Sequence, residues 1–261
     1  GLLCVADAGN RRVQILSYDG VYMGEITLRT NKDEMMSPVD VAVDVQNKIY
    51  VIDSEGHRVR IFDPTGSHIK SFGAKGRGVE GFSNPASIAV DAYGQIYVSD
   101  TGNHKLKKFD AQGRLLASIG SEGDGPGQFR RPLGLTVDKA GAVYILDAEK
   151  NTLQVFTSEK ADAKPLSIAS PLPSIEVLKE ISIVKPGASG IAFEKRLWGL
   201  TGDSIAALSV IGGRRIGASG SDPGMFKNPK GIAIDNSGNF WVADTGNDRL
   251  QKLSREGNLL Q

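Results

Sequence analysis

Side chains that can do chemistry recur in this chain at one fixed spacing. Asp53, Asp100 and Asp147 are separated by 47 residues each time, and His57 and His104 keep the same separation. Carboxylates and imidazoles are ligands for metal ions, and the basic residues that follow them are typical of phosphate contacts. So regular a spacing also indicates a repeated structural unit, in which the same residues hold each copy together.

Nucleophilic catalysis is not indicated by the sequence. The chain has one cysteine, Cys4, inside an apolar stretch, and it has no Gly-x-Ser-x-Gly motif. The glycine-rich stretch 120–127 carries acidic residues and lacks the Gly-Lys-Ser/Thr ending of a phosphate-binding loop. We therefore predict no catalytic residue and no bound cofactor.

The elements that position the recurring residues form an internal repeat. The stretch PASIAVDAYGQIYVSDTGNHKLKKFDAQGRLLASIG begins at Pro85. Similar stretches begin at Pro38, Pro132 and Pro229. A partial copy opens the chain, with Asp7 as its aspartate, and an altered copy spans 190–220, with Thr201 at that position.

Four short runs of alternating apolar and polar residues make up each copy, and Gly, Asn and Asp separate them. This pattern predicts antiparallel strands. Four strands per copy and a period in the forties are typical of propeller blades, which bury their apolar faces by stacking. We predict an all-β, six-bladed β-propeller in one domain, residues 1–261, with an incomplete first blade and a degenerate fifth. The expected blades are 1–30, 36–73, 82–120, 129–170, 187–220 and 226–261.

Two regions depart from the repeat. The first copy starts at its second strand, so blade 1 lacks its inner strand, and the last copy stops near Leu260 as a fourth strand begins. We expect the parent protein to continue past Gln261, with the missing strand outside this chain or the ring incompletely closed. The segment 157–186 does not fit the repeat either, and we expect its part 175–183 to be a strand or a patch over blade 5.

Residues on one face of such a propeller are the candidates for binding a ligand. Loops between the second and third strands share that face with the segments that link successive blades, and both surround the mouth of the channel. The candidate ligand-binding residues are Arg11, Arg12, Asp40, His57, Arg58, Arg77, His104, Lys105, Arg130, Arg131, Lys150, Asp248 and Arg249.

Metal chemistry in the channel is the enzymatic alternative. Each first strand places one residue at the mouth of the channel: Asp40, Ser87, Gly134, Gly190 and Gly231. One carboxylate among small residues is a poor site for calcium, and catalytic zinc takes three protein ligands. The third histidine, His68, falls on an outermost strand and cannot join the other two. We predict no metal site.

Recurrence separates structural residues from functional candidates. The repeated aspartates are suited to accept backbone N–H groups and hold their turns. The repeated basic residues fit pairing with a neighbouring blade, and Phe82, Phe129 and Phe226 fit plugs between blades. The residues that do not recur are the better candidates for function: Arg11, Asp40, Arg77, Arg130, Arg131, Lys150 and Asp248.

The last copy resembles the NHL repeat family most clearly. Its motif residues are Pro229, Gly231, Asp235, Trp241, Asp244, Thr245, Gly246, Asn247 and Arg249. The resemblance covers nearly the whole chain and implies the propeller fold. It leaves several activities open, since relatives include protein-binding and RNA-binding propellers, extracytoplasmic sensor domains of bacteria, and amidating lyases with metal sites.

The strong repeat and the lack of a convergent catalytic group favour a recognition module. The 31 basic and 30 acidic residues nearly cancel, which argues against binding nucleic acid through bulk charge. No apolar run approaches the ~18 residues of a membrane helix. We predict a monomeric, non-catalytic module of a larger protein that binds a protein partner. A metal-assisted lyase or hydrolase is the first alternative, and RNA binding through Arg11, Arg12, Arg58, Lys105, Arg130 and Arg131 is the second. The compartment stays open.

Overall fold

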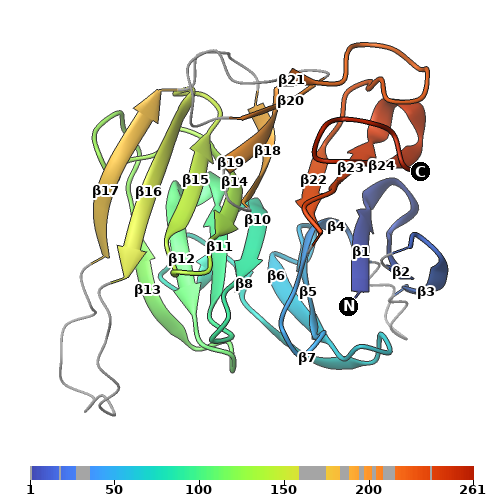
Figure 1. Cartoon of the computed structure of the whole chain (residues 1–261). Coiled ribbons are helices and arrows are strands. Elements are labelled where there is room, and N and C mark those ends of the chain that lie inside the picture. The colour runs from blue at the N-terminus through green and yellow to red at the C-terminus, as the bar shows by residue number, and fades with distance from the viewer. Residues whose placement is uncertain are drawn as a thin grey trace.

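A computed structural model shows six antiparallel sheets that follow one another around the molecule in chain order (Figure 1). It describes residues 2–17, 19–27, 36–158, 175–182, 188–193, 197–201, 204–207, 215–235 and 237–261. None of the helices in these ranges is long and apolar enough to cross a membrane.

Each sheet is one blade, and its strands pair in chain order from the inside outward. Blade 1 has β1 (Leu2–Asp7), β2 (Arg12–Ser17) and β3 (Tyr22–Ile26). Blade 2 has β4 (Pro38–Val43), β5 (Ile49–Asp53), β6 (Arg58–Phe62) and β7 (His68–Phe72). Blade 3 has β10 (Pro85–Val90), β11 (Ile96–Asp100), β12 (Lys105–Phe109) and β13 (Leu115–Ile119).

The later blades follow the same plan. Blade 4 has β14 (Pro132–Val137), β15 (Val143–Asp147), β16 (Thr152–Ser158) and β17 (Ile175–Ser182). Blade 5 has β18 (Ala188–Phe193), β19 (Leu197–Thr201), β20 (Ile205–Ala207) and β21 (Arg215–Ile216). Blade 6 has β22 (Gly231–Ile234), β23 (Phe240–Asp244) and β24 (Arg249–Leu253). The predicted six-bladed all-β propeller is confirmed.

Shorter elements sit in the connections. A two-stranded parallel pair, β8 (Ala74–Lys75) and β9 (Gly81–Phe82), closes the loop between blades 2 and 3. Single 3₁₀ turns follow the aspartates of blades 1, 3 and 6: η1 (Ala8–Asn10), η2 (Thr101–Asn103) and η3 (Thr245–Asn247).

The hydrophobic core is divided among the interfaces between blades. Between blades 2 and 3, Tyr50 and Ile52 of β5 pack against Ile88 of β10 and Val98 of β11. The alternation along each strand explains this, because successive side chains point to opposite faces of the sheet and each face meets a different neighbour. The inner strands β4, β10, β14, β18 and β22 pack side by side around the centre.

Blade 4 contains the segment that the repeat left unexplained. Residues 175–182 form β17, which pairs with β16 as the outer strand of blade 4. The expectation that this stretch is a strand is confirmed, but the strand completes blade 4 and does not patch blade 5, so blade 4 extends beyond the expected 129–170. The repeat did not assign this strand to blade 4, because the connection between Ser158 and Ile175 is much longer than the corresponding turns of other blades. That connection lies outside the described residues.

The ring closes on its outer side between blades 6 and 1. Leu3 and Leu16 of blade 1 bury themselves against Trp241 of blade 6. The end of the chain bridges back to β24 through Leu253 and Leu259, so a fourth strand begins here, as predicted. The Gln261 side chain lies beside Gly20 in the β2–β3 turn. Blade 1 itself has three strands in the described structure.

Candidate functional site

The repeated aspartates anchor the loops of the candidate binding face. Asp100, at the end of β11, is fully buried. Its carboxylate accepts hydrogen bonds from the Ser83 backbone N–H at 2.7 Å and from the Asn103 side chain at 2.7 Å. The Lys107 ammonium lies 3.0 Å away. One carboxylate thus ties the loop from the preceding blade to its own turn and to its own third strand.

The aspartates of blades 1, 2, 4 and 6 make similar contacts. Asp53 accepts the backbone N–H groups of Ser37 (3.1 Å) and Gly56 (3.2 Å), and it pairs with Arg58 (3.0 Å) and Arg60 (2.8 Å). Burial raises the pKa of Asp53, but these donors and guanidinium groups outweigh it and hold the pKa below its usual value. The predicted turn-holding role of the repeated aspartates is confirmed.

The repeated basic residues pair mainly within their own blade. Arg12 bonds Asp7 at 2.8 Å, and Arg249 bonds Asp244 at 2.8 Å. Arg249 also donates to the Met225 carbonyl of the linking loop at 2.8 Å. The expectation of pairing with a neighbouring blade was wrong for these ion pairs, because the third strand runs antiparallel to the second and returns its first residue to the aspartate's side.

Lys105 shows the same use of a repeated base. Its ammonium donates to the Gly120 carbonyl at the end of its own blade.

The three linking-loop phenylalanines, Phe82, Phe129 and Phe226, are fully buried. Phe82 lies in the core between blades 2 and 3, which confirms that these rings plug gaps between blades and are not available to stack on a ligand.

Several non-recurring candidates are also committed to contacts within the chain. Arg11 forms a two-pronged pair with Glu55 of blade 2, at 3.1 and 3.3 Å. Arg130 does the same with Asp124, at 3.1 and 2.8 Å. These partners are exposed, so each pair contributes little to stability but still occupies the guanidinium.

Three candidates remain open to a partner: Arg77, Arg131 and Asp248. All three are exposed, and their side chains have no bonded partner among the described residues. The Arg131 carbonyl accepts the Ala148 N–H at 3.0 Å, which fixes this residue beside the β15–β16 turn. Asp248 follows η3 in a left-handed conformation with φ of 51°. The loop face therefore presents both signs of charge on fixed backbone.

Asp40 lies on the inner strand of blade 2, where we expected the channel mouth. Its carboxylate accepts the Ser87 hydroxyl at 2.7 Å and the Ile88 N–H at 2.9 Å. The Ser87 oxygen accepts the Leu135 N–H at 3.2 Å in turn, so this chain of hydrogen bonds joins the inner strands of blades 2, 3 and 4. Burial raises the pKa of Asp40, and its hydrogen bonds oppose the shift without cancelling it.

Each histidine has its own local setting. His57 and His104 occupy equivalent left-handed positions, with φ of 47° and 54°. The Nδ1 atom of His104 lies 2.9 Å from the Arg130 carbonyl. His68 lies on the outer strand β7, as predicted, with its Nε2 atom 2.8 Å from the Ser71 hydroxyl. In the part of the chain that the structure describes, no three His, Cys, Asp or Glu side chains converge on a possible metal position.

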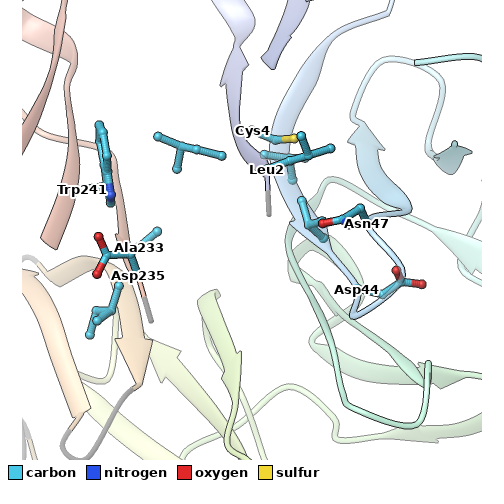
Figure 2. A pocket seen from close by; sticks show the side chains of 11 residues that line it. Leu2, Cys4, Asp44, Asn47, Ala233, Asp235 and Trp241 are labelled. Atoms are coloured by element: carbon cyan, nitrogen blue, oxygen red, sulfur yellow. The ribbon is translucent and has the colours of Figure 1, made fainter. Parts of the chain in front are cut away.

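A second feature was not among the predicted site residues. A groove of about 280 Å³ lies between blades 1, 2 and 6 (Figure 2). Its lining residues are Leu2, Leu3, Cys4, Val41, Val43, Asp44, Asn47, Ala233, Ile234, Asp235 and Trp241.

Lys150 completes the account of the loop face. Its ammonium lies 3.4 Å from the Gly125 carbonyl and 3.3 Å from the Gln128 carbonyl. It therefore fastens the linking loop between blades 3 and 4. Most of the predicted binding face thus serves to hold loops in place, and a small remainder points outward.

Comparisons with known proteins agree with this architecture. A family model described as a 6-bladed beta-propeller matches residues 24–113 and 92–162, and a model of the NHL repeat matches residues 226–253. No curated protein matches the sequence.

Solved structures with the same fold differ widely in what they do. A virginiamycin B lyase from Staphylococcus aureus is 15% identical, with a TM-score of 0.65 over 97% of this chain and 76% of the lyase chain. A chain from a nidogen/laminin complex is 15% identical, with a TM-score of 0.69 over 100% of this chain and 92% of the other. A protein of unknown function from Bacteroides caccae is 15% identical, with a TM-score of 0.65 over 99% and 92%. This chain belongs to the six-bladed β-propeller family, and its sixth blade is an NHL repeat.

Proposed function

We propose that this propeller is a non-catalytic recognition module that binds a protein partner on its loop face. This proposal rests on the different roles of recurring and non-recurring side chains on the loop face. The recurring groups hold the turns, whereas Arg77, Arg131 and Asp248 are exposed, differ from blade to blade and are mounted on hydrogen-bonded loops. A rigid scaffold that presents non-repeating loop residues is the usual basis of specific recognition.

The charges on this face favour a protein over RNA. Of the six basic residues that would contact RNA, five are engaged within the chain: Arg11, Arg12, Arg58, Lys105 and Arg130. Binding RNA through them would require breaking those contacts. The charged side chains that stay exposed on this face include the carboxylate of Asp248, which repels phosphates. A protein surface can instead present charges of both signs that match those of this face.

Metal-assisted lyase or hydrolase chemistry is the competing proposal, and the lyase with the same fold is the reason to test it. The residue that would carry it here is Asp40, whose carboxylate already accepts two donors from blade 3. Calorimetric titration with calcium and zinc separates the proposals. Stoichiometric binding of either ion would favour the channel as the site.

The recognition proposal is tested by charge reversal on each face. We expect Arg131→Glu and Asp248→Lys to abolish capture of a partner protein from an extract of the source cells. With the purified partner, each variant should raise the dissociation constant at least about tenfold. Lys139→Glu is the matched control, because Lys139 is exposed in the β14–β15 turn on the opposite face. Capture that ignores the loop-face variants, or that ribonuclease abolishes, would contradict the proposal.

A further inference from the structure

Three of the loops that link successive blades share one backbone structure. They span residues 73–82, 120–129 and 217–226, between blades 2 and 3, blades 3 and 4, and blades 5 and 6. Each begins with glycine and ends in a buried phenylalanine. In each loop, the fourth residue donates its backbone N–H to the carbonyl of that phenylalanine, at 3.0, 3.3 and 3.0 Å. Side chains at equivalent positions of these loops are therefore directly comparable.

In the 120–129 loop, the fifth residue pairs with the residue that follows the phenylalanine. Arg130 donates two hydrogen bonds to the carboxylate of Asp124, at 3.1 and 2.8 Å. The equivalents of Asp124 and Arg130 in the 73–82 loop are Arg77 and Ser83. Arg77 is exposed, and its guanidinium has no bonded partner among the described residues. The 73–82 loop therefore offers a guanidinium and a hydroxyl at these two positions but lacks the carboxylate.

A second departure from the 120–129 loop lies at the same end of the 73–82 loop. The Nδ1 atom of His104 lies 2.9 Å from the Arg130 carbonyl. The equivalent of His104 in blade 2 is His57, which should therefore face Ser83. The Ser83 carbonyl instead accepts the Gly102 N–H at 2.7 Å, and the buried Nδ1 atom of His57 has no hydrogen-bond partner in the described structure. Two groups that the 120–129 loop pairs internally are thus unpaired here.

The backbone on both sides of Arg77 is held by hydrogen bonds. The Asn103 side chain donates to the Gly76 carbonyl at 3.0 Å. The Gly81 N–H donates to the Gly78 carbonyl at 3.1 Å. A fixed backbone lowers the entropic cost of binding, because only the Arg77 side chain has to be ordered by a partner.

The exposed tip of the 73–82 loop combines positive charge with an apolar side chain. Its exposed charged residues are Lys75, Arg77 and Glu80, so its net charge is positive. Val79 is 64% exposed, at a position where the other two loops have proline. Such a tip is complementary to an acidic side chain that has an apolar neighbour.

We infer that the 73–82 loop binds an aspartate or glutamate side chain of the protein partner, with an apolar residue of the partner against Val79. This inference rests on the proposed recognition function and names the chemistry that is recognised. The partner's carboxylate takes the place that Asp124 has in the 120–129 loop. Arg77 donates two parallel hydrogen bonds to it, the arrangement in which guanidinium and carboxylate match best, and the Ser83 hydroxyl donates a third.

A displayed library of short random peptides tests this chemistry without a known partner. Selection on the wild-type protein should enrich peptides with Asp or Glu next to an apolar residue. Selection on Arg77→Glu should instead enrich Lys or Arg, because the charge at the site is reversed. Lys139→Glu, the same change of charge at an exposed position on the opposite face, should keep the preference for acidic peptides.

The selections separate failure of this inference from failure of the recognition function. Enriched peptides whose binding depends on Arg131 and Asp248 but not on Arg77 would overturn the carboxylate site and leave the recognition function standing. Selection of no peptide above the uncoated surface would count against both.

The contact itself is measured by fluorescence anisotropy with the most enriched acidic peptide. Replacing its acidic residue by the matching amide should raise the dissociation constant about tenfold, and so should Arg77→Ala. Ser83→Ala should raise it about threefold. Arg77→Ala should have little further effect on the amide peptide, because the pair is already broken. An equal effect of Arg77→Ala on both peptides would overturn the proposed pair.

A carboxylate placed within the chain should compete with the peptide. Ser83→Glu puts an acid at the position of Arg130, where the same backbone already carries a long side chain, so the variant should fold. It should pair with Arg77, as Arg130 pairs with Asp124, and weaken the peptide at least about tenfold. Ser83→Gln has the same size without the charge and should weaken it about threefold. Equal losses in both variants would overturn the inference, because shape and not charge would then decide binding.

Discussion

Removing the Asp100 carboxylate should destabilise the propeller strongly, because it leaves a buried ammonium without its counter-charge. Lys107 is 1% exposed, and it keeps only the carbonyls of Gly81 and Gly78 as acceptors. Removing one partner of a buried ion pair costs about 3–5 kcal/mol, and the retained carbonyls place the cost near the lower end. The lost hydrogen bond to Ser83 adds about 1 kcal/mol. We expect Asp100→Ala to lower the free energy of unfolding by about 4 kcal/mol.

The chain itself offers the compensating variant. Gln154 and Gln251 occupy the position of Lys107 in blades 4 and 6, and each donates to a linking-loop carbonyl at 2.7 Å. Lys107→Gln should therefore cost about 1 kcal/mol, and Asp100→Ala should cost about 2 kcal/mol less in that background. Urea unfolding followed by circular dichroism and tryptophan fluorescence measures all four proteins. Additive losses, or a loss below about 1 kcal/mol for Asp100→Ala, would refute the ion-pair reasoning.

Two further predictions concern the channel and the linking loops. Asp40→Asn should stabilise the protein at neutral pH, because burial raises the pKa of Asp40 and so disfavours its charged form. The wild-type protein binds the extra proton when folded, so its free energy of unfolding rises as the pH falls toward about 4. The advantage of the variant should therefore shrink at that pH, as measured by urea unfolding. Gly120→Ala should lower the free energy of unfolding by at least about 2 kcal/mol, because φ is +101° and the new Cβ would lie 2.7 Å from the Phe129 ring. Gly141→Ala is the control, since φ there is +85° and the space around the new Cβ is open, and it should cost about 1 kcal/mol. Thermal unfolding measures both variants.

The repeat predicted most of the architecture because its register is set by local chemistry. The inner strands of blades 2 to 4 begin at a proline, and the ladder of each shifts register between that proline and the second residue after it. Proline lacks the N–H that a continuous ladder needs, so a bulge follows it. A fixed spacing of prolines, turn residues and aspartates therefore specifies the same sheet several times, and the strands fall where the alternation places them.

The candidate site was harder to predict because pairing depends on distances between blades. The sequence places Arg11 and Arg131 on the same face and gives no reason to prefer either residue as a ligand contact. Only the structure shows that Glu55 lies within 3.1 Å of Arg11 and that Arg131 stays exposed. The sequence offered residues 175–183 as a strand but did not assign that strand to blade 4, for a related reason. Its partner is set by pairing across a long connection, and strand pairing through long loops leaves no fixed spacing in the sequence.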